Sequence, residues 1–290
     1  MLIPNKLQPG DTVAITATSS AVNSTKLEAG IKVLESLGLK PYPLPSCYQN
    51  HGYLAGTDSQ RLKDLHTAFK NKEIKGIFAA RGGYGSARLL PYIDYDLIKN
   101  NPKIFVGFSD VTALHIAFNQ ICKLVTFHGP MPGANLGDDI HPVTLNSLKQ
   151  NLFTPNIITK NAPPSGIIAP IVGGNLSMVC ASLGTNFEIK TDRCILFLEE
   201  IDEAPYKVDR LFLQLKQAGK FKNVVGITLG SFFPETMESL KTAIDELILT
   251  ENKPLITGIP IGHTSPTLTI PLGLPVDVSS LKTLMPQEVS

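Results

Sequence analysis

Tryptophan, long apolar runs and blocks of like charge are all missing from this sequence of 290 residues. The longest apolar runs, such as Cys194–Leu198 and Ile77–Ala80, have the length of strands and fall far short of the roughly 20 residues that span a bilayer. Lys and Arg number 26 against 25 Asp and Glu, a net charge of +1, and no cluster of basic residues stands out. The sequence therefore argues against membrane binding and against nucleic-acid binding.

Patterns typical of metal sites and disulfides are missing as well. The six histidines show no H-x-x-x-H spacing, and C-x-x-C spacing is absent among the cysteines, which are Cys47, Cys122, Cys180 and Cys194. We therefore expect buried free thiols, and neither a metal nor another cofactor. The first residues contain no basic region followed by an apolar stretch. We therefore expect no secretory signal, and we predict a cytoplasmic location.

Strand and helix signals alternate through the first half of the chain. Apolar residues make up 43% of the sequence and charged residues 18%, enough to bury a core. The strand-like segments are residues 12–16, 39–44, 74–80, 104–108 and 124–127. Helical segments lie between them, including one in which Thr25 and Glu28 have capping-box spacing and Gly38 is placed to end the helix. This alternation predicts a parallel sheet with helices on both faces.

A Pro-rich stretch from Thr154 to Pro170 interrupts the alternation. Strand signals resume after it, at residues 194–199, 224–230, 255–261 and 267–272. We interpret the stretch as a connection between two domains. The predicted organisation is an N-terminal domain over residues 1–155, a linker over 156–168 and a C-terminal domain over 169–290.

Ser109 lies where the buried segment 103–108 meets a helical segment that begins at Asp110. A sharp turn at such a junction exposes a serine hydroxyl at the carboxyl end of a parallel sheet and directs the first helical N–H groups toward a substrate. The segment has the outline of a nucleophile elbow, although Gly107-Phe-Ser-Asp-Val111 lacks the second glycine of G-x-S-x-G. The alternative is a serine that only caps the helix.

A glycine-rich turn, Arg81-Gly-Gly-Tyr-Gly85, follows the predicted strand at residues 74–80. Adjacent glycines present backbone N–H groups without side-chain obstruction, which suits an oxyanion hole or a bound carboxylate or phosphate. The G-x-G-x-x-G pattern of a dinucleotide site is absent here. A turn needed only for its geometry is the alternative.

Glu199 and Glu200 end an apolar strand, where open α/β sheets place functional groups. An acid at that point can fix the tautomer and orientation of a histidine base, and we assign this role to Glu199. Asp202 and Glu203 come next, and we expect them to favour the start of the following helix.

His263 is the best candidate for a general base. It follows a short β segment and lies in a loop between Gly262 and Pro266, where an imidazole stays accessible. His128, at the end of the strand-like segment 124–127, is its competitor.

Taken together, these segments resemble the LD-carboxypeptidase family of serine peptidases, also called muramoyltetrapeptide carboxypeptidases. The resemblance covers nearly the whole chain, in order, and its motifs are Leu7-Gln-Pro-Gly-Asp11, Ala80-Arg-Gly-Gly-Tyr-Gly85, Gly107-Phe-Ser-Asp-Val-Thr-Ala113, His128-Gly-Pro-Met131, Gly173-Gly-Asn-Leu176, Leu196-Phe-Leu-Glu-Glu200 and Gly262-His263. Each motif is short, so the match depends on their common order and spacing.

The resemblance implies a flavodoxin-like N-terminal domain with a parallel sheet and a smaller α/β C-terminal domain, with the site in the cleft between them. The family's nucleophile falls on Ser109, its acid on Glu199 rather than the adjacent Glu200, and its base on His263. The oxyanion hole falls on the backbone N–H groups of Gly83 and Asp110.

The implied reaction releases terminal D-alanine from cytoplasmic murein tetrapeptides by cutting the bond that joins it to the L-configured centre of a diamino acid. The enzyme would act in peptidoglycan recycling, as a homodimer. Arg81 and Tyr84 are candidates for substrate binding, and Arg81 is the candidate for holding the free carboxylate of the substrate.

Three alternatives stay open. Some members of the same family cleave peptide–nucleotide antibiotics and confer self-immunity, using aromatic stacking on the base, and the lack of tryptophan favours the murein substrate. A glutamine amidotransferase-like amidase would place Cys where this chain has Ser109. A non-catalytic ligand-binding module would hold an anion at Arg81–Gly85 and release it unchanged.

Overall fold

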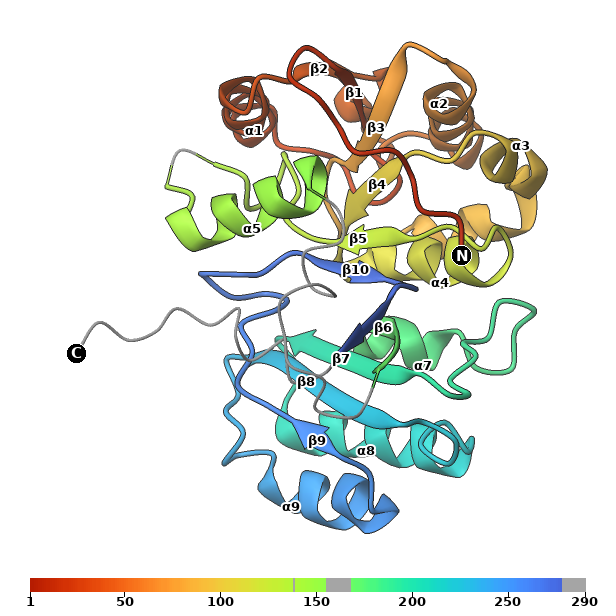
Figure 1. The fold of residues 1–290 in the computed structure, drawn as a ribbon, viewed down its shortest axis with the longest axis vertical. Helices are drawn as coiled ribbons and strands as arrows, with labels where there is room; N and C mark the ends of the chain where they lie inside the picture. Colours follow the sequence, from red (N-terminus) through yellow and green to blue (C-terminus); the bar gives the residue numbers. More distant parts are fainter. Residues whose placement is uncertain (138, 155–167, 278–290) are drawn as a thin grey trace.

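The computed structural model describes residues 1–137, 139–154 and 168–277. The strands of these residues form two sheets, which lie one above the other in Figure 1 and are each covered by helices. The α/β architecture expected from the sequence is confirmed.

The first sheet has six strands in the order β10-β5-β4-β3-β1-β2. Its members are β1 (Thr12–Thr16), β2 (Lys40–Pro43), β3 (Ile74–Ala79), β4 (Ile104–Gly107), β5 (Thr126–His128) and β10 (Ile270–Leu272). Strands β1 to β5 pair in parallel, and their order is the flavodoxin-like one. Strand β10 comes from the other end of the chain and pairs antiparallel with β5.

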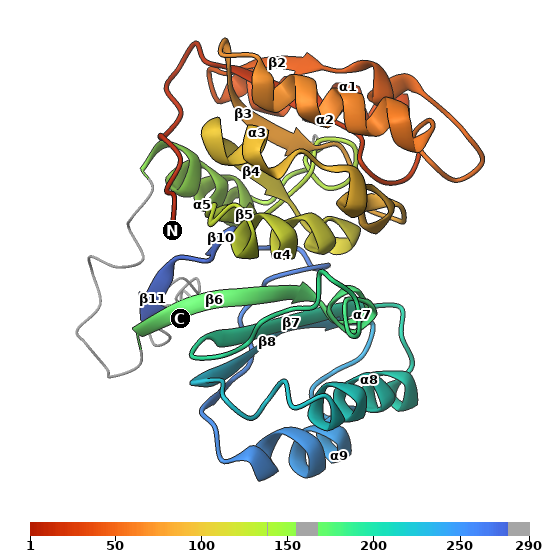
Figure 2. The same cartoon turned by 90° about the vertical axis from the view of Figure 1, so that its right-hand side faces the viewer.

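Helices cover both faces of the first sheet (Figure 2). Helices α1 (Ser24–Ser36) and α5 (Pro142–Phe153) pack on one face, and α2 (Asp58–Lys70), α3 (Tyr95–Asn100) and α4 (Thr112–Gln120) pack on the other. Within β1, Val13 and Ile15 pack in the core beneath α1 and α5, while Ala14 packs in the core beneath α2, α3 and α4. Both sides of the strand are buried, as in parallel sheets generally.

The second sheet has five strands in the order β11-β6-β7-β8-β9. They are β6 (Ile168–Asn175), β7 (Ile195–Ile201), β8 (Gly226–Phe233), β9 (Leu255–Ile256) and β11 (Pro275–Asp277), of which only β11 is antiparallel to its neighbour. Helices α7 (Leu176–Ala181), α8 (Pro205–Gln217) and α9 (Lys241–Ala243) pack on one face. The returning segment that ends in β10 packs on the other.

Two local features differ from the expectations, and a third prediction falls mostly outside the described residues. The capping box predicted at Thr25 and Glu28 is wrong, because the N-cap of α1 is Asn23, two residues before Thr25, and its side chain accepts the cap bond from the Lys26 N–H at 3.0 Å. The segment after the glycine-rich turn is a 3₁₀ helix, Ser86–Tyr92. Most of the linker predicted over residues 156–168 lies outside the described residues, and its last residue begins β6.

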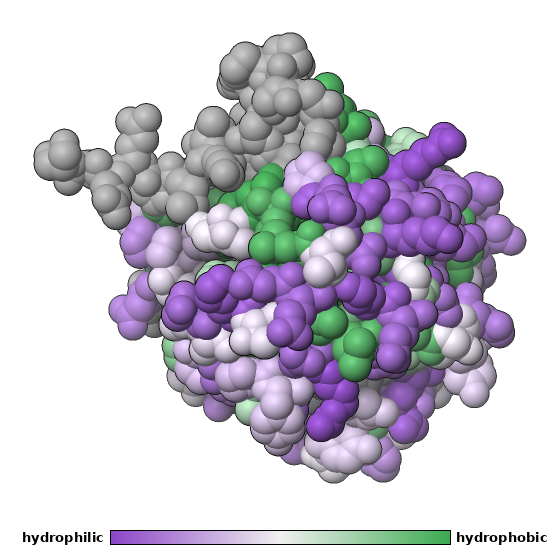
Figure 3. Space-filling model, turned by 90° about the horizontal axis from the view of Figure 1, so that it is seen from below, coloured by the Kyte–Doolittle hydropathy of each residue, from purple (hydrophilic) through white to green (hydrophobic). Residues whose placement is uncertain are grey.

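The four cysteines are buried free thiols, as expected. None of the described helices is long and apolar enough to cross a membrane. The face drawn in Figure 3 is mainly hydrophilic, with small hydrophobic patches set among polar residues, which is ordinary for the surface of a globular protein.

Candidate active site

Ser109 sits in a strained turn between β4 and α4. Its φ is 64°, a left-handed value that a side chain adopts at a cost, and it begins the short 3₁₀ helix Ser109–Val111. Strain of this kind is typical of a nucleophile elbow, because the sharp turn lifts the hydroxyl out of the sheet. Ser109 is half-buried, between two fully packed neighbours.

The glycine-rich turn packs directly against this serine. A Cβ placed on Gly82 would lie 2.9 Å from Ser109 Oγ and 3.5 Å from the backbone N of Asp110. Gly83 has a φ of 104°, and a Cβ there would lie 2.3 Å from Ser20 Oγ. The peptide that joins the two glycines therefore runs beside Ser109, where only glycines fit.

The fully buried Glu199 pairs with the partly buried His263. His263 Nδ1 lies 2.7 Å from Glu199 Oε2, a length typical of a charge-assisted hydrogen bond. The register between β7 and β8 shifts at Glu199, and such irregularities re-aim side chains near active sites. Gly262, with a φ of 115°, lets the loop approach, since a Cβ there would lie 2.5 Å from Glu199 Oε2.

The pair shifts the protonation of both partners. Burial alone would raise the pKa of Glu199, but His128 and His263 beside it lower that pKa to about 2. Burial alone would lower the pKa of His263, but its hydrogen bond to the Glu199 carboxylate raises that pKa above the ordinary value. An ionised Glu199 thus stabilises the protonated form of His263, which is what a general base needs at the moment it accepts a proton.

Glu200 points away from His263. Its Oε1 accepts from Asn175 Nδ2 at 2.7 Å, and its Oε2 accepts from the Ser177 N–H at 2.8 Å, at the start of α7. Its carboxylate therefore stabilises a helix start and a neighbouring side chain. Of the two adjacent acids, only Glu199 contacts the imidazole.

Phe108 connects the serine to the histidine. The Phe108 ring centroid lies 4.7 Å from that of His263, so the residue before Ser109 packs on the imidazole. Among the described residues, His263 forms a hydrogen bond with Glu199 and does not form one with Ser109. Bonds between nucleophile and base are often long in an enzyme without substrate.

The buried carboxylate of Asp110 stabilises the turn at Ser109 through two hydrogen bonds. Asp110 Oδ2 accepts from Ser19 Oγ at 2.6 Å and from the Ser86 N–H at 2.8 Å. Burial raises the pKa of Asp110, and these donors act against that rise. The Asp110 side chain thus joins the end of β1, the glycine-rich turn and the serine turn.

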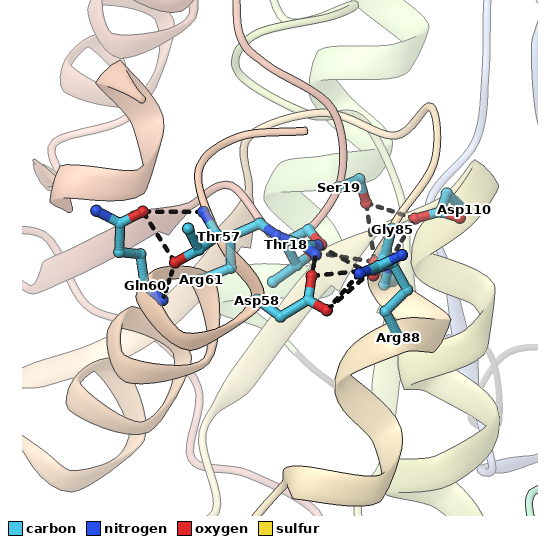
Figure 4. Close-up of polar contacts among 10 residues, drawn as sticks. Thr18, Ser19, Thr57, Asp58, Gln60, Arg61, Gly85, Arg88 and Asp110 are labelled. Atoms are coloured by element: carbon cyan, nitrogen blue, oxygen red, sulfur yellow. Dashed lines mark hydrogen bonds and ion pairs between the residues drawn. The ribbon is translucent and has the colours of Figure 1, made fainter. Parts of the chain in front are cut away.

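Arg61 anchors the same region from α2 (Figure 4). Its side chain is fully buried, and its Nη1 donates to the backbone oxygens of Thr18 and Gly85, the second at 3.0 Å. Its Nη2 pairs with Asp58, which also pairs with Arg88. These contacts fix the backbone carbonyls of Thr18, after β1, and of Gly85, at the end of the glycine-rich turn.

A cavity of about 830 Å³ opens beside Phe108 and His263. Arg81, Lys26 and Asn135 line it from the first domain, and Ile201 and Phe233 from the second; further lining residues are Asn23, Gly133, Ala134, Thr264 and Ser265. A neighbouring cavity of about 410 Å³ shares Lys26, Ala134, Asn135, Thr264 and Ser265 with it. The two form one groove that leads away from the histidine.

The two candidate substrate-binding residues have different positions. Arg81 lines the cavity and donates from Nη1 to the Ala21 oxygen at 3.0 Å. The ring of Tyr84 packs edge-on against Tyr53, with centroids 5.7 Å apart, and is half exposed. Of the two, only Arg81 is among the described residues that line the cavity.

Sequence reasoning missed the supporting roles of Ser19, Ser86 and Arg61. Small hydroxyls and a lone arginine carry no spacing pattern that would single them out. Nor do the described residues contain a group of three or more His, Cys, Asp or Glu arranged to hold a metal.

Comparison with known proteins identifies the family. The sequence model of the LD-carboxypeptidase N-terminal domain matches residues 13–129, and that of the LD-carboxypeptidase C-terminal domain matches residues 169–278. The chain belongs to the LD-carboxypeptidase family. It is 41% identical to the probable murein peptide carboxypeptidase of Bacillus subtilis, over 93% of this chain and 89% of that protein.

Solved structures agree with this assignment. A muramoyltetrapeptide carboxypeptidase from Oxalobacter formigenes superposes with a TM-score of 0.81 at 30% identity, covering 90% of this chain and 92% of the other. The microcin C7 self-immunity protein MccF, in complex with aspartyl sulfamoyl adenosine, superposes with a TM-score of 0.82 at 26% identity and 94% of each chain. This LD-carboxypeptidase family member therefore shares its two-domain fold with a murein peptidase and a self-immunity protein.

Proposed function

We propose that this family member is a serine carboxypeptidase that releases terminal D-alanine from murein tetrapeptides by hydrolysing the bond to the L-configured centre of the preceding diamino acid. The observation that carries the proposal is the hydrogen bond of 2.7 Å between His263 and the buried Glu199, together with a serine in a left-handed turn. The murein peptide carboxypeptidase names of its relatives support the substrate class.

In the proposed mechanism, His263 takes the proton from Ser109 as the serine oxygen attacks the scissile carbonyl. Glu199 holds the imidazole and stabilises its protonated form. His263 then gives the proton to the leaving amine of D-alanine, and water hydrolyses the acyl-enzyme. The same histidine serves as base and acid because its pKa is raised by a buried anion.

The oxyanion that forms during attack needs donors that are already in place. We assign this role to the N–H groups of Gly83 and Asp110, because the peptide after Gly82 and the start of the 3₁₀ helix both lie against Ser109. Donors of this kind contribute about 2.7–4 kcal/mol each in serine hydrolases.

A carboxypeptidase must also hold the free carboxylate of its substrate. Arg81 and Lys26 are the cationic residues that line the cavity beside His263, and we assign the carboxylate to Arg81. The continuation of the groove toward the second cavity gives room for the remainder of an extended peptide.

The cellular setting follows from the same resemblance. We infer a cytoplasmic enzyme of peptidoglycan recycling that acts as a homodimer. Cell fractionation and sedimentation equilibrium of the purified protein test the location and the oligomeric state separately from the activity.

Self-immunity hydrolysis of a peptide–nucleotide is the second candidate. The structural likeness to MccF favours it, since one complex of that protein holds aspartyl sulfamoyl adenosine. The absence of tryptophan from this chain argues against strong aromatic stacking on the nucleobase of such a substrate.

The deciding experiment is mass spectrometry of a murein tetrapeptide incubated with the purified protein or with Ser109→Ala. We expect the native protein to remove one alanine, and Ser109→Ala and His263→Ala each to abolish turnover. The double variant should lose little more than either single variant, because the residues act as one unit. Alanine release by Ser109→Ala would exclude this serine as nucleophile, and no release by the native protein would redirect the assay to peptide–nucleotides.

A further inference from the structure

His128 lies at the end of β5, within the wall of the site, and has no role in the mechanism above. Its side chain is 1% exposed. Its ring lies between two phenylalanines, with centroids 5.4 Å from Phe108 and 5.1 Å from Phe197. Phe108 also packs on His263, and Phe197 precedes Glu199 by two residues in β7. The two phenylalanine rings fix the plane of the His128 imidazole.

The polar atoms of this histidine and of Glu199 are complementary and unused. Among the described residues neither ring nitrogen of His128 has a hydrogen-bond partner, and neither does Glu199 Oε1. His128 Nε2 and Glu199 Oε1 lie 4.0 Å apart. Buried polar atoms nearly always have a partner, and a closer approach of about 1 Å would turn this pair into a charge-assisted hydrogen bond.

We infer that His128 is a positioning residue, which donates from Nε2 to Glu199 Oε1 and so holds the carboxylate that orients His263. The carboxylate would then be fixed at both oxygens, by His263 at Oε2 and by His128 at Oε1. His128 would also withdraw negative charge from Glu199 and limit how strongly Glu199 raises the basicity of His263. The inference rests on the proposed function for its kinetic consequence, but not for the contact itself.

The surroundings of His128 contain few other charges. Across the sheet it pairs in register with Gly107 of β4 and Ile270 of β10, which are not titratable. His115 faces it from α4, but burial lowers the pKa of His115 to about 3, so this ring is neutral. His263 lies beyond Phe108, on the far side of Glu199. Among the described residues, the carboxylate that faces His128 is therefore that of Glu199.

Two substitutions separate positioning from packing. His128→Phe keeps a ring but removes the donor, whereas His128→Gln keeps an N–H donor. For His128→Phe we expect kcat to fall about 10- to 100-fold with KM changed less than about twofold, because the groups are misaligned rather than the substrate released. We also expect the acidic limb of kcat/KM to move to higher pH, since Glu199 would then raise the pKa of His263 further. His128→Gln should recover most of the rate and the wild-type limb.

His115→Phe is the matched control. His115 is equally buried, but its nitrogens bond to Thr126 Oγ1 and to the Gly107 oxygen, each at 2.8 Å, and not to Glu199. Its loss should lower the thermal midpoint without moving the acidic limb. Wild-type kcat and pH dependence in His128→Phe, or a His128→Gln variant no better than His128→Phe, would overturn the inference.

A spectroscopic measurement removes the dependence on substrate, and its first readout, the tautomer of His128 in the native protein, needs no variant. In ¹⁵N-histidine NMR spectra we expect His128 to carry its proton on Nε2, and its signal to shift more than that of His115 when Glu199 is replaced by Gln. A His128 ring protonated only at Nδ1 would refute the contact. Absence of alanine release by the native protein would instead count against the proposed function and leave this result standing.

Discussion

Two adjacent glutamates at the end of β7 have different chemical roles. The side chain of Glu199 bonds to His263, while that of Glu200 bonds to Asn175 and to the start of α7. Alternation of side chains along a strand accounts for the separation, because neighbouring residues point to opposite faces. The division predicts opposite consequences for the same chemical substitution at the two positions.

Glu199→Gln should lower kcat by about 10³- to 10⁴-fold, since the amide cannot stabilise a protonated His263 and permits the wrong tautomer. Glu200→Gln, the control, should keep kcat within a few-fold and lose stability instead, by about 0.5–2 kcal/mol from the weakened helix start. Steady-state kinetics and urea unfolding of both variants measure the two effects. Equal losses of kcat would mean that the acid has been assigned to the wrong residue.

The pH dependence gives Glu199→Gln a second readout. A general base must be neutral to accept a proton, so activity falls as pH drops through the pKa of His263, which Glu199 raises above its ordinary 6.5. Removing the anion lowers that pKa, and the acidic limb of the residual activity should move to lower pH. A limb that stays in place would show that a different group controls it.

At the scale of single elements, the turn at Arg81–Gly85 depends on a helix distant in sequence. Arg61 reaches from α2 to the carbonyls of Thr18 and Gly85, and Asp110 holds the other side of the turn through Ser86. The turn itself was predictable from its glycines. Its supports were not, because a buried arginine that bonds to backbone oxygens has the same sequence appearance as one on the surface of a helix.

Arg61→Met should lower the free energy of unfolding by about 2–4 kcal/mol, since it leaves two buried carbonyls without a donor. It should also lower kcat about 10- to 100-fold, because the turn beside Ser109 is no longer fixed. Arg88→Met is the control: Arg88 pairs with the same Asp58 but lies at the surface, and we expect little change in either quantity. Calorimetry and kinetics of the two variants test this, and equal effects would refute a special role for the buried arginine.

At the scale of the molecule, the local elements were easier to predict than their pairing. Strands β1, β3 and β4 lie close to their predicted ranges because buried parallel strands are continuous apolar runs. The order β2-β1-β3-β4-β5 followed from the family resemblance. The addition of β10 to the first sheet could not be read from the residues, since the pairing partner of a three-residue strand leaves no local signal.

The return of the chain to the first sheet at β10 connects the two domains. Asn119 of α4 donates to the Leu272 oxygen of β10, and Thr144 of α5 accepts from the Thr267 N–H at 2.8 Å. Ile116 of α4 belongs to the core of the second sheet. Unfolding of either half would therefore expose apolar surface and unpaired backbone groups of the other.

We therefore expect the two halves to unfold together. The absence of tryptophan allows one probe to be placed in each half: Phe153→Trp in the half-buried part of α5, and Tyr206→Trp beside Arg210 in α8. The urea midpoints of the two fluorescence transitions should coincide with each other and with the circular dichroism transition, as for a single cooperative unit. Separate midpoints would show that the contacts of β10 and α4 are too weak to couple the sheets. In that case the cavity that Phe108 lines on one side and His263 on the other would be free to open by domain movement.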